Sequence, residues 1–250
     1  MSDLQDTIVL VVPIWNDAAR FGRYAPFLAE ALAASGLPIR WVISDDGSTQ
    51  EEQEKLKRLL VDLRSIYPNT ECLFARERSR KGGAVYRAWD VYPEAEWVGF
   101  VDADGAIDSS TVLRLLRCAI EQGREGGCIA VRCDSIETPV KRPLGRVLSF
   151  RFFSFLVRHL IGLPFVDTQC GVKILPGRAY RAVAGTLKEK GFIFDVELLL
   201  ALDRHGSQIK EVAIPWREIP GGKVHPLRDA WRMAGGLFRI NKRLRAGHYE

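Results

Sequence analysis

The chain has no hydrophobic run long enough to cross a bilayer. A helical span needs roughly 20 apolar residues, whereas the best candidate, 152–157, is interrupted by a serine and closed by an arginine on each side. The N-terminal residues are also unlike a signal peptide, because acidic residues precede a short apolar run that Pro13 ends without a cleavage pattern. We therefore expect neither a membrane-spanning helix nor a secretory leader, and a cytoplasmic protein.

Cysteine is scarce and poorly spaced for metal or disulfide chemistry. The five cysteines are odd in number and form no CxxC pair, which argues against structural zinc and favours a reducing compartment. Repeats, low-complexity segments and nucleic-acid-binding motifs are also missing, and the net charge of +5 is dispersed, so we expect no nucleic-acid partner. With 47% hydrophobic and 27% charged residues, the composition is that of a folded globular protein.

What the sequence does contain is a regular alternation of two hydrophobic patterns. Short, predominantly apolar runs, typical of buried strands, lie at 7–14, 39–44, 71–75, 97–101 and 128–131. Patterns with the helical period lie between them, at 18–35, 51–65, 84–89 and 110–122. This order predicts an α/β domain with a mostly parallel sheet and helices on both faces.

The most informative stretch is 97–108, WVGFVDADGAID, where the fourth apolar run ends in acidic residues. Asp102 and Asp104 have the i, i+2 spacing that can aim two carboxylates at one point. Because the two charges repel each other, a hard divalent cation bound to phosphate is their natural partner. Ligands of such sheets lie beyond the carboxyl ends of the strands. The alternative is helix capping by Asp104 or Asp108, which we favour for Asp108.

Polar residues follow the three preceding strands as well: Asn16 and Asp17, then Asp45 and Asp46, then Arg80 and Lys81. Asp45 and Asp46 either shape a turn and cap the next helix or bind the base and ribose of a nucleotide. Lys81 precedes two glycines, 82–83, which would let the backbone approach a diphosphate closely. Four polar clusters in phase with the strands predict one shared rim of the sheet.

The second half of the chain is less regular. Residues 144–162 form a helical pattern that is apolar and aromatic except for a narrow polar stripe, so this helix is either buried or lies on a membrane surface. The basic helix at 226–244 is either a solvated face or a contact with anionic lipid. Between them, a polar turn at 167–171 enters a short strand, and Asp195 opens a helix either as its N-cap or as a site residue.

With these residues laid out, the chain resembles the family 2 glycosyltransferases with the GT-A fold, and more narrowly the dolichyl-phosphate or polyprenyl-phosphate hexose synthases. The matching motifs are VVPIWND at 11, SDDGST at 44, KGGAV at 81, FVDADG at 100, DTQCGVK at 167, FDVELL at 194 and PWREIPGGKV at 215. The resemblance implies one domain with a nucleotide-sugar-binding half at 1–135 and an acceptor-binding half at 136–250. The chain departs from the family pattern at Asp17, usually Glu, at Arg80, usually Gly, and at Val172, usually Phe.

The same resemblance implies an inverting transfer of a hexose from a UDP- or GDP-linked donor to a polyprenyl or dolichyl phosphate, dependent on Mg²⁺ or Mn²⁺. The implied metal ligands are Asp102 and Asp104, and the catalytic candidates are Asp167 and Asp195. The implied donor-binding residues are Pro13, Asn16, Asp17, Asp45, Asp46, Lys81 and Asp102. The implied acceptor-binding residues are Gln169, Glu197, Arg151, Arg217 and Lys223.

The acceptor decides whether a general base is needed. A phosphate is already an anion, whereas a hydroxyl acceptor would need Asp167 or Asp195 to remove its proton. The main alternative is therefore a soluble family 2 glycosyltransferase that acts on a hydroxyl of a small molecule or glycan. A nucleotidyltransferase is disfavoured because no glycine-rich loop follows the first strand, and a non-catalytic nucleotide-sugar-binding module because the Asp102/Asp104 pair is intact. A polyprenyl-phosphate acceptor predicts peripheral membrane contact through 144–162 and the basic C-terminal helix.

Overall fold

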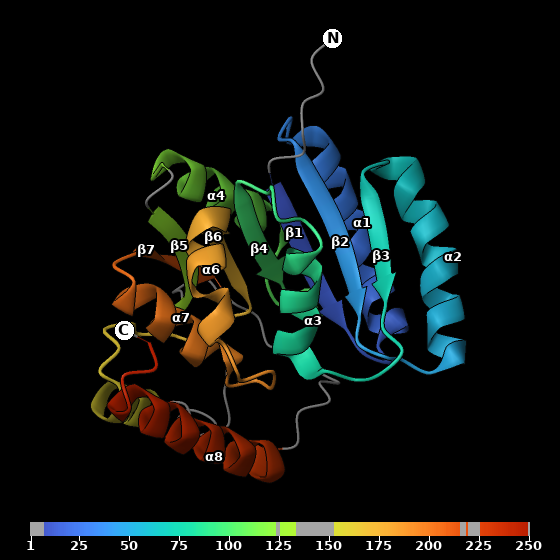
Figure 1. Ribbon diagram of the computed structural model, residues 1–250. Coiled ribbons are helices and arrows are strands. Elements are labelled where there is room, and N and C mark those ends of the chain that lie inside the picture. Colours follow the sequence, from blue (N-terminus) through green and yellow to red (C-terminus); the bar gives the residue numbers. More distant parts are fainter. Residues whose placement is uncertain (1–7, 124–125, 134–152, 216–218, 220–225, 250) are drawn as a thin grey trace.

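A seven-stranded sheet with helices on both faces forms the body of the computed structural model (Figure 1). It describes residues 8–123, 126–133, 153–215, 219 and 226–249. The strands in that part of the chain are β1 (Ile8–Ile14), β2 (Ile39–Asp45), β3 (Thr70–Phe74), β4 (Trp97–Val101), β5 (Gly126–Cys133), β6 (Val172–Pro176) and β7 (Gln208–Pro215). The helices there are α1 (Ala18–Ala34), α2 (Gln50–Ile66), α3 (Arg80–Asp90), α4 (Ser109–Glu121), α6 (Gly177–Val183), α7 (Phe194–Arg204) and α8 (Pro226–Arg245), with short turns η1 (Val157–Ile161) and η2 (Ala184–Thr186).

Strand β1 shows how one apolar run builds the core on both faces of the sheet. Leu10 and Val12 are buried in one hydrophobic cluster, and Val9 and Val11 in the other, because successive strand residues point to opposite sides. Helices α1, α2 and α4 cover the first face, and α3, α6 and α7 cover the second (Figure 1). The predicted sheet and its flanking helices are therefore confirmed.

Strand β6 breaks the parallel order in a way that the sequence pattern did not predict. The strand order is β3-β2-β1-β4-β6-β5-β7, and β6 runs antiparallel to both β4 and β5. The other neighbouring pairs are parallel. Because β6 enters the sheet beside β4, the polar turn that precedes it is carried next to the carboxyl end of β4. The second half of the chain thus reaches the rim predicted from the first half.

Most elements begin and end within a few residues of their predicted positions. Asp108 caps α4 as predicted, accepting from the backbone N–H of residue 111, and Thr49 caps α2, accepting from that of residue 52. Helix α3 begins at Arg80 instead of residue 84, so the end of the predicted basic loop forms its first turn. Helix α6 was not predicted. Residues 144–152 lie outside the described part of the chain.

Helix α8 lies beyond the edge of the sheet toward which the parallel strands run, below the sheet in Figure 1. It packs against η1. Leu237 and Ile240 are buried, whereas Trp231 and Phe238 are 78% and 62% exposed. Across the residues that the structure describes, no helix is long and apolar enough to span a membrane. The predicted basic helix is therefore present and amphipathic, and it faces the same edge as the candidate site.

Candidate active site

The polar residues after β1 and β2 are joined by hydrogen bonds. The backbone N–H of Asn16 donates to Ser48 Oγ at 2.7 Å, and that of Thr49 donates to Asn16 Oδ1 at 2.8 Å. Asn16 adopts a φ of 48°, in the left-handed region that asparagine tolerates better than most residues. Pro13, near the end of β1, is partly buried beside this turn. The two strand ends therefore form one connected rim, as predicted.

The neighbouring acids Asp45 and Asp46 have different surroundings. Asp45 is fully buried, and its Oδ2 accepts from the backbone N–H of Ser48 at 3.2 Å and from Gln53 Nε2 at 2.9 Å. Asp46 Oδ1 accepts from the backbone N–H and the hydroxyl of Ser79, at 2.7 and 2.8 Å. Asp45 thus shapes the turn, whereas Asp46 ties β2 to the basic loop that precedes α3.

Two carboxylates stand just past the carboxyl end of β4, and each is held by one cation. Lys81 Nζ lies 2.7 Å from Asp102 Oδ1, and Arg20 Nη2 lies 2.8 Å from Asp104 Oδ2. Arg20 Nη1 is also 3.7 Å from Asp17 Oδ2. The side chains of Asp102 and Asp104 remain 35% and 30% exposed. Burial, together with the charge of Asp102, raises the pKa of Asp104, so the folded protein disfavours the ionised form of Asp104.

Gly171 fixes the position of Asp102. The backbone N–H of Asp102 donates to the Gly171 carbonyl at 2.9 Å, which extends the β4–β6 pairing beyond the strand. A Cβ at position 171 would overlap the Asp102 carboxylate. The neighbouring Cys170 is buried, and burial raises the pKa of its thiol to about 12. The DTQCG motif therefore contributes a bare backbone surface for Asp102 and a packing cysteine.

The structure corrects our interpretation of Gly82 and Gly83. Both are buried in the first turn of α3, where they make room for protein atoms. A Cβ on Gly82 would lie 2.5 Å from the Phe194 side chain, and one on Gly83 would lie 2.6 Å from Ser79. Gly83 N–H also donates to the Lys190 carbonyl at 3.2 Å. These glycines allow α3 to pack closely against α7, and this packing fixes the position of Lys81, which precedes them.

Asp195 lies in the first turn of α7 and is not its N-cap, which is Ile193. Its buried carboxylate places Oδ1 2.6 Å from Lys173 Nζ and Oδ2 4.0 Å from Lys81 Nζ. Burial raises the pKa of Asp195, an effect that the charges of Lys173 and Lys81 oppose without cancelling. Because Lys81 also contacts Asp102, it links the predicted donor side to the predicted acceptor side.

Asp167 forms a two-point ion pair with Arg132, at the end of β5. Arg132 Nε lies 2.6 Å from Asp167 Oδ2, and Nη2 lies 2.9 Å from Oδ1. The backbone N–H of Gln169 also donates to Oδ1 at 3.1 Å. Burial alone would raise the pKa of Asp167, but Arg132 outweighs it and the pKa is lowered. A carboxylate held in this way is a weak base.

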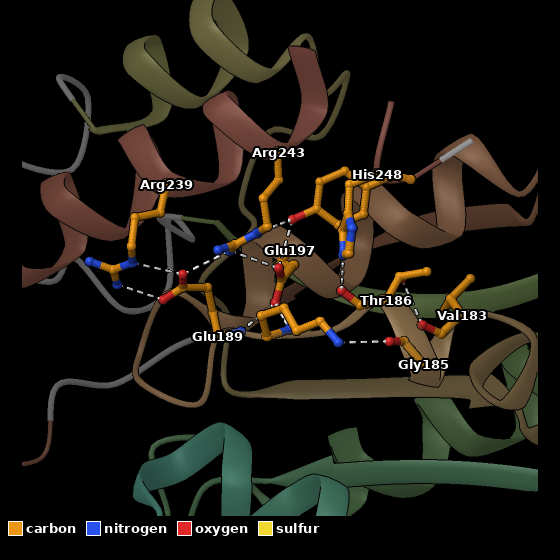
Figure 2. Close-up of polar contacts among 10 residues, drawn as sticks. Val183, Gly185, Thr186, Glu189, Glu197, Arg239, Arg243 and His248 are labelled. Atoms are coloured by element: carbon orange, nitrogen blue, oxygen red, sulfur yellow. Dashed lines mark hydrogen bonds and ion pairs between the residues drawn. The ribbon is translucent and has the colours of Figure 1, made fainter. Parts of the chain in front are cut away.

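The structure places Glu197 in a network that joins α7 to α8 (Figure 2). Glu197 Oε2 accepts from the backbone N–H groups of Lys188 and Glu189, at 2.7 and 2.6 Å. Its Oε1 accepts from Arg243 at 2.9 Å and from the Tyr249 hydroxyl at 2.6 Å. The carboxylate is fully buried and satisfied by protein donors. Its observed contacts are structural, in contrast to the acceptor contact that we predicted.

Three further acceptor predictions, Arg151, Arg217 and Lys223, lie outside the described residues. Sequence reasoning missed three cations that the structure brings to predicted carboxylates: Arg20, Arg132 and Lys173. A buried acid needs a partner, but nothing in the local sequence identifies which cation supplies it. It also missed the Arg78 guanidinium, which stacks 3.3 Å above the Trp15 ring.

The Asp102/Asp104 pair has the chemistry that Mg²⁺ or Mn²⁺ requires. Magnesium is commonly held by one or two carboxylates together with substrate phosphates and water. Both side chains offer partly exposed oxygens, and burial and the charge of Asp102 raise the pKa of Asp104, so a bound cation would stabilise the ionised pair. The described residues contain no group of three or more His, Cys, Asp or Glu that could hold a metal alone. Donor phosphates and water would therefore supply the remaining ligands.

The sheet, its antiparallel β6 and the carboxylate–cation rim define a GT-A glycosyltransferase. Residues 9–183 match the family described as glycosyl transferase family 2. The chain belongs to that family, which confirms the resemblance drawn from its motifs.

Among curated relatives, the chain is similar to two dolichyl-phosphate beta-glucosyltransferases. The Saccharomyces cerevisiae protein is 29% identical over 258 residues, which cover 96% of this chain and 76% of the yeast protein. The Dictyostelium discoideum protein is 30% identical, and the match covers 84% of this chain and 64% of that protein. Within family 2, the chain therefore falls in a branch like the polyprenyl-phosphate hexose synthases.

Solved structures confirm the fold. Mannosyl-3-phosphoglycerate synthase from Rubrobacter xylanophilus has a TM-score of 0.67 at 18% identity, covering 98% of this chain and 76% of that one. Glucosyl-3-phosphoglycerate synthase from Mycobacterium tuberculosis, in complex with Mn²⁺, UDP and phosphoglyceric acid, has a TM-score of 0.64 at 17% identity, covering 94% and 77%. At these identities the likeness concerns the GT-A fold alone.

Proposed function

We propose that this protein is an inverting glycosyltransferase that moves a hexose from a UDP- or GDP-linked donor to the phosphate of a polyprenyl phosphate. The similarity to dolichyl-phosphate beta-glucosyltransferases over nearly the whole chain supports a lipid phosphate as the acceptor. The observation that carries this choice over a hydroxyl acceptor is that both candidate bases are held by cations.

Neither candidate base is placed to accept a proton. Asp167 is clamped by the Arg132 guanidinium, which lowers its pKa. Burial raises the pKa of Asp195, but its side chain is only 2% exposed and lies 2.6 Å from Lys173, so an acceptor hydroxyl does not reach it. A hydroxyl acceptor would require one of these carboxylates to break its ion pair, whereas a phosphate acceptor attacks as an anion and needs no base. Both aspartates then act as positioning residues for the cations around them.

On the donor side, Asp102 and Asp104 would hold Mg²⁺ or Mn²⁺ on the diphosphate, and Asp46 would bind the base or ribose. The bound metal would neutralise the departing nucleoside diphosphate. Lys81 lies between Asp102 and Asp195 and places a fixed positive charge at the junction of the two sides.

A lipid acceptor requires contact with a membrane, and α8 offers a surface for it. Trp231 and Phe238 are exposed on this helix, and its last turn carries the exposed Lys242 and Arg245. Amphipathic helices with exposed aromatics and basic residues bind anionic bilayers. We infer a peripheral contact with the cytoplasmic membrane face. In flotation, the wild type should rise with anionic vesicles and Trp231→Ser/Phe238→Ser should not; a wild type that stays at the bottom would contradict this contact.

The function is tested by incubating the enzyme with labelled UDP-glucose, UDP-GlcNAc or GDP-mannose and either citronellyl phosphate or citronellol. We expect Mn²⁺- or Mg²⁺-dependent labelling of the phosphate alone, abolished by EDTA, with inversion at the sugar carbon seen by NMR. Labelling of the alcohol in preference to the phosphate would overturn the proposal and favour the hydroxyl-acceptor alternative.

A further inference from the structure

A cavity of about 550 Å³ lies between the start of α3, the segment before α7, and α8. Its charged lining residues are Arg80, Lys188, Glu189, Lys190, Arg232 and Arg239. Apolar side chains, among them Phe192 and Trp231, line the rest. The volume lies within the range of small-molecule sites, and five cations against one carboxylate make the cavity strongly basic.

The single carboxylate does not balance this charge. Glu189 is bonded to Arg239, at 2.7 Å, and to Arg243, at 2.8 Å, so its charge is already shared between two guanidinium groups. Within the described part of the chain, no hydrogen bond or ion pair engages the side chains of Arg80 or Lys190. Two cations without carboxylate partners on one cavity wall favour a ligand with more than one negative charge.

Arg80 holds its place against a local backbone preference. Its φ is 70°, in the left-handed region, which costs a non-glycine residue roughly 1 kcal/mol or more. The family pattern has glycine here, which adopts this conformation freely. The chain thus keeps a strained arginine where glycine would fold more easily, and strain of this kind is characteristic of functional sites. The side chain projects past Gly191 along the cavity wall.

We propose that this cavity binds the phosphate group of a lipid phosphate. Arg80 and Lys190 contact the phosphate, and the apolar chain leaves along Phe192 and Trp231, which are 40% and 78% exposed. The proposal rests on the proposed function and deepens it, because the ligand is then the acceptor. Arg80 directly precedes Lys81, so one residue of the cavity wall and the cation that links the two sides of the active site share the first turn of α3.

The experiment is calorimetric titration of citronellyl phosphate into wild type, Arg80→Gly, Lys190→Ala and the control Arg76→Gly, which removes an exposed arginine from the same loop. We expect Arg80→Gly and Lys190→Ala each to raise Kd about tenfold or more, the usual weight of a charge-assisted hydrogen bond. Arg76→Gly should bind like wild type. Arg80→Gly should melt no lower than wild type, because glycine relieves the strain.

Four outcomes would overturn the inference. Unchanged binding by a folded Arg80→Gly would remove Arg80 from the site. If Arg76→Gly weakened the binding of citronellyl phosphate as much as Arg80→Gly does, the effect would come from the overall positive charge of the loop and not from a contact with Arg80. If inorganic phosphate binds as tightly as citronellyl phosphate, the cavity is a site for free anions. If Arg80→Gly loses binding to anionic vesicles but still binds citronellyl phosphate, Arg80 contacts membrane headgroups instead.

Transfer kinetics separate this inference from the proposed function. If the wild type glycosylates citronellyl phosphate and Arg80→Gly keeps its KM for that acceptor, the function holds and the cavity assignment fails. If the wild type binds citronellyl phosphate through Arg80 but never glycosylates it, the cavity assignment holds and the function fails.

Discussion

Two pairs of acidic residues in this protein differ in what surrounds them. The side chains of Asp102 and Asp104 are each about one-third exposed, and each is paired with one cation. Glu189 and Glu197 are buried and bonded to Arg239, Arg243, Tyr249 and backbone N–H groups. The first pair has oxygens left for a ligand, and the second has none. An acidic motif therefore indicates a binding site only when the fold leaves its charge incompletely compensated.

The largest expected effect is on activity, from Asp104→Asn. Losing one carboxylate of the proposed metal pair should slow transfer by at least about a hundredfold. Stability should change little, because the carboxylate is partly exposed and its raised pKa shows that the fold does not favour its charge. Initial rates and the melting temperature measure the two effects. If Asp104→Asn lost much stability but kept its activity, Asp104 would be a structural carboxylate like Glu197.

The converse effect is expected from Glu197→Gln, which should cost about 3 kcal/mol in the free energy of unfolding. The substitution removes one of the two buried counter-charges of Arg243, leaving Glu189, and replaces an acceptor oxygen by a donor group. Urea denaturation measures this loss. Arg243→Ala should cost a similar amount and the double variant less than the sum, because both changes remove the same interaction. Strict additivity would mean that the two side chains are not coupled.

A smaller effect on activity is expected from Gly171→Ala. The new methyl group would overlap the Asp102 carboxylate and displace it, so we expect a loss of transfer of about tenfold. Gly185→Ala is the matched control, because its Cβ would meet nothing within 4 Å. When the rate is measured against Mn²⁺ concentration, only Gly171→Ala should need a higher concentration to reach half of its maximal rate. Equal behaviour of the two alanine variants would remove Gly171 from the site.

The smallest effect concerns acid stability. Burial raises the pKa of Glu189. The two guanidinium groups of Arg239 and Arg243 lower that pKa by more than burial raises it, so the net shift is downward. The ion pairs therefore stabilise the fold fully above the unfolded-state pKa of about 4.3, and this contribution disappears as pH falls through the lower folded-state pKa. Wild type should lose about 1 kcal/mol more than Glu189→Gln on acidification through this window. If the free energy of unfolding falls equally with pH in wild type and Glu189→Gln, the ion pairs of Glu189 are not the source of this acid sensitivity.

The sequence was sufficient to predict the strands, because runs such as those of β1 and β4 are too apolar to lie anywhere but the interior. It also predicted the rim, because residues after parallel strands must meet at one edge. It could not predict β6 between β4 and β5, since strand order depends on packing between distant segments. For the same reason it missed Arg132 and Lys173, whose partners are fixed by that order.

The position of β6 also has a consequence for how the chain is made. In the described sheet, β5 pairs only with β6 and β7, both of which follow it in sequence. Strands β1 to β4 can assemble as soon as residue 101 is available, but β5 has no neighbour until β6 at residues 172–176 has been synthesised. A nascent chain that ends near residue 135 would expose an unpaired apolar strand, which is a hazard for aggregation. The predicted boundary between donor and acceptor halves is therefore unsuited to truncation, because the last strand of the first half is held by the second.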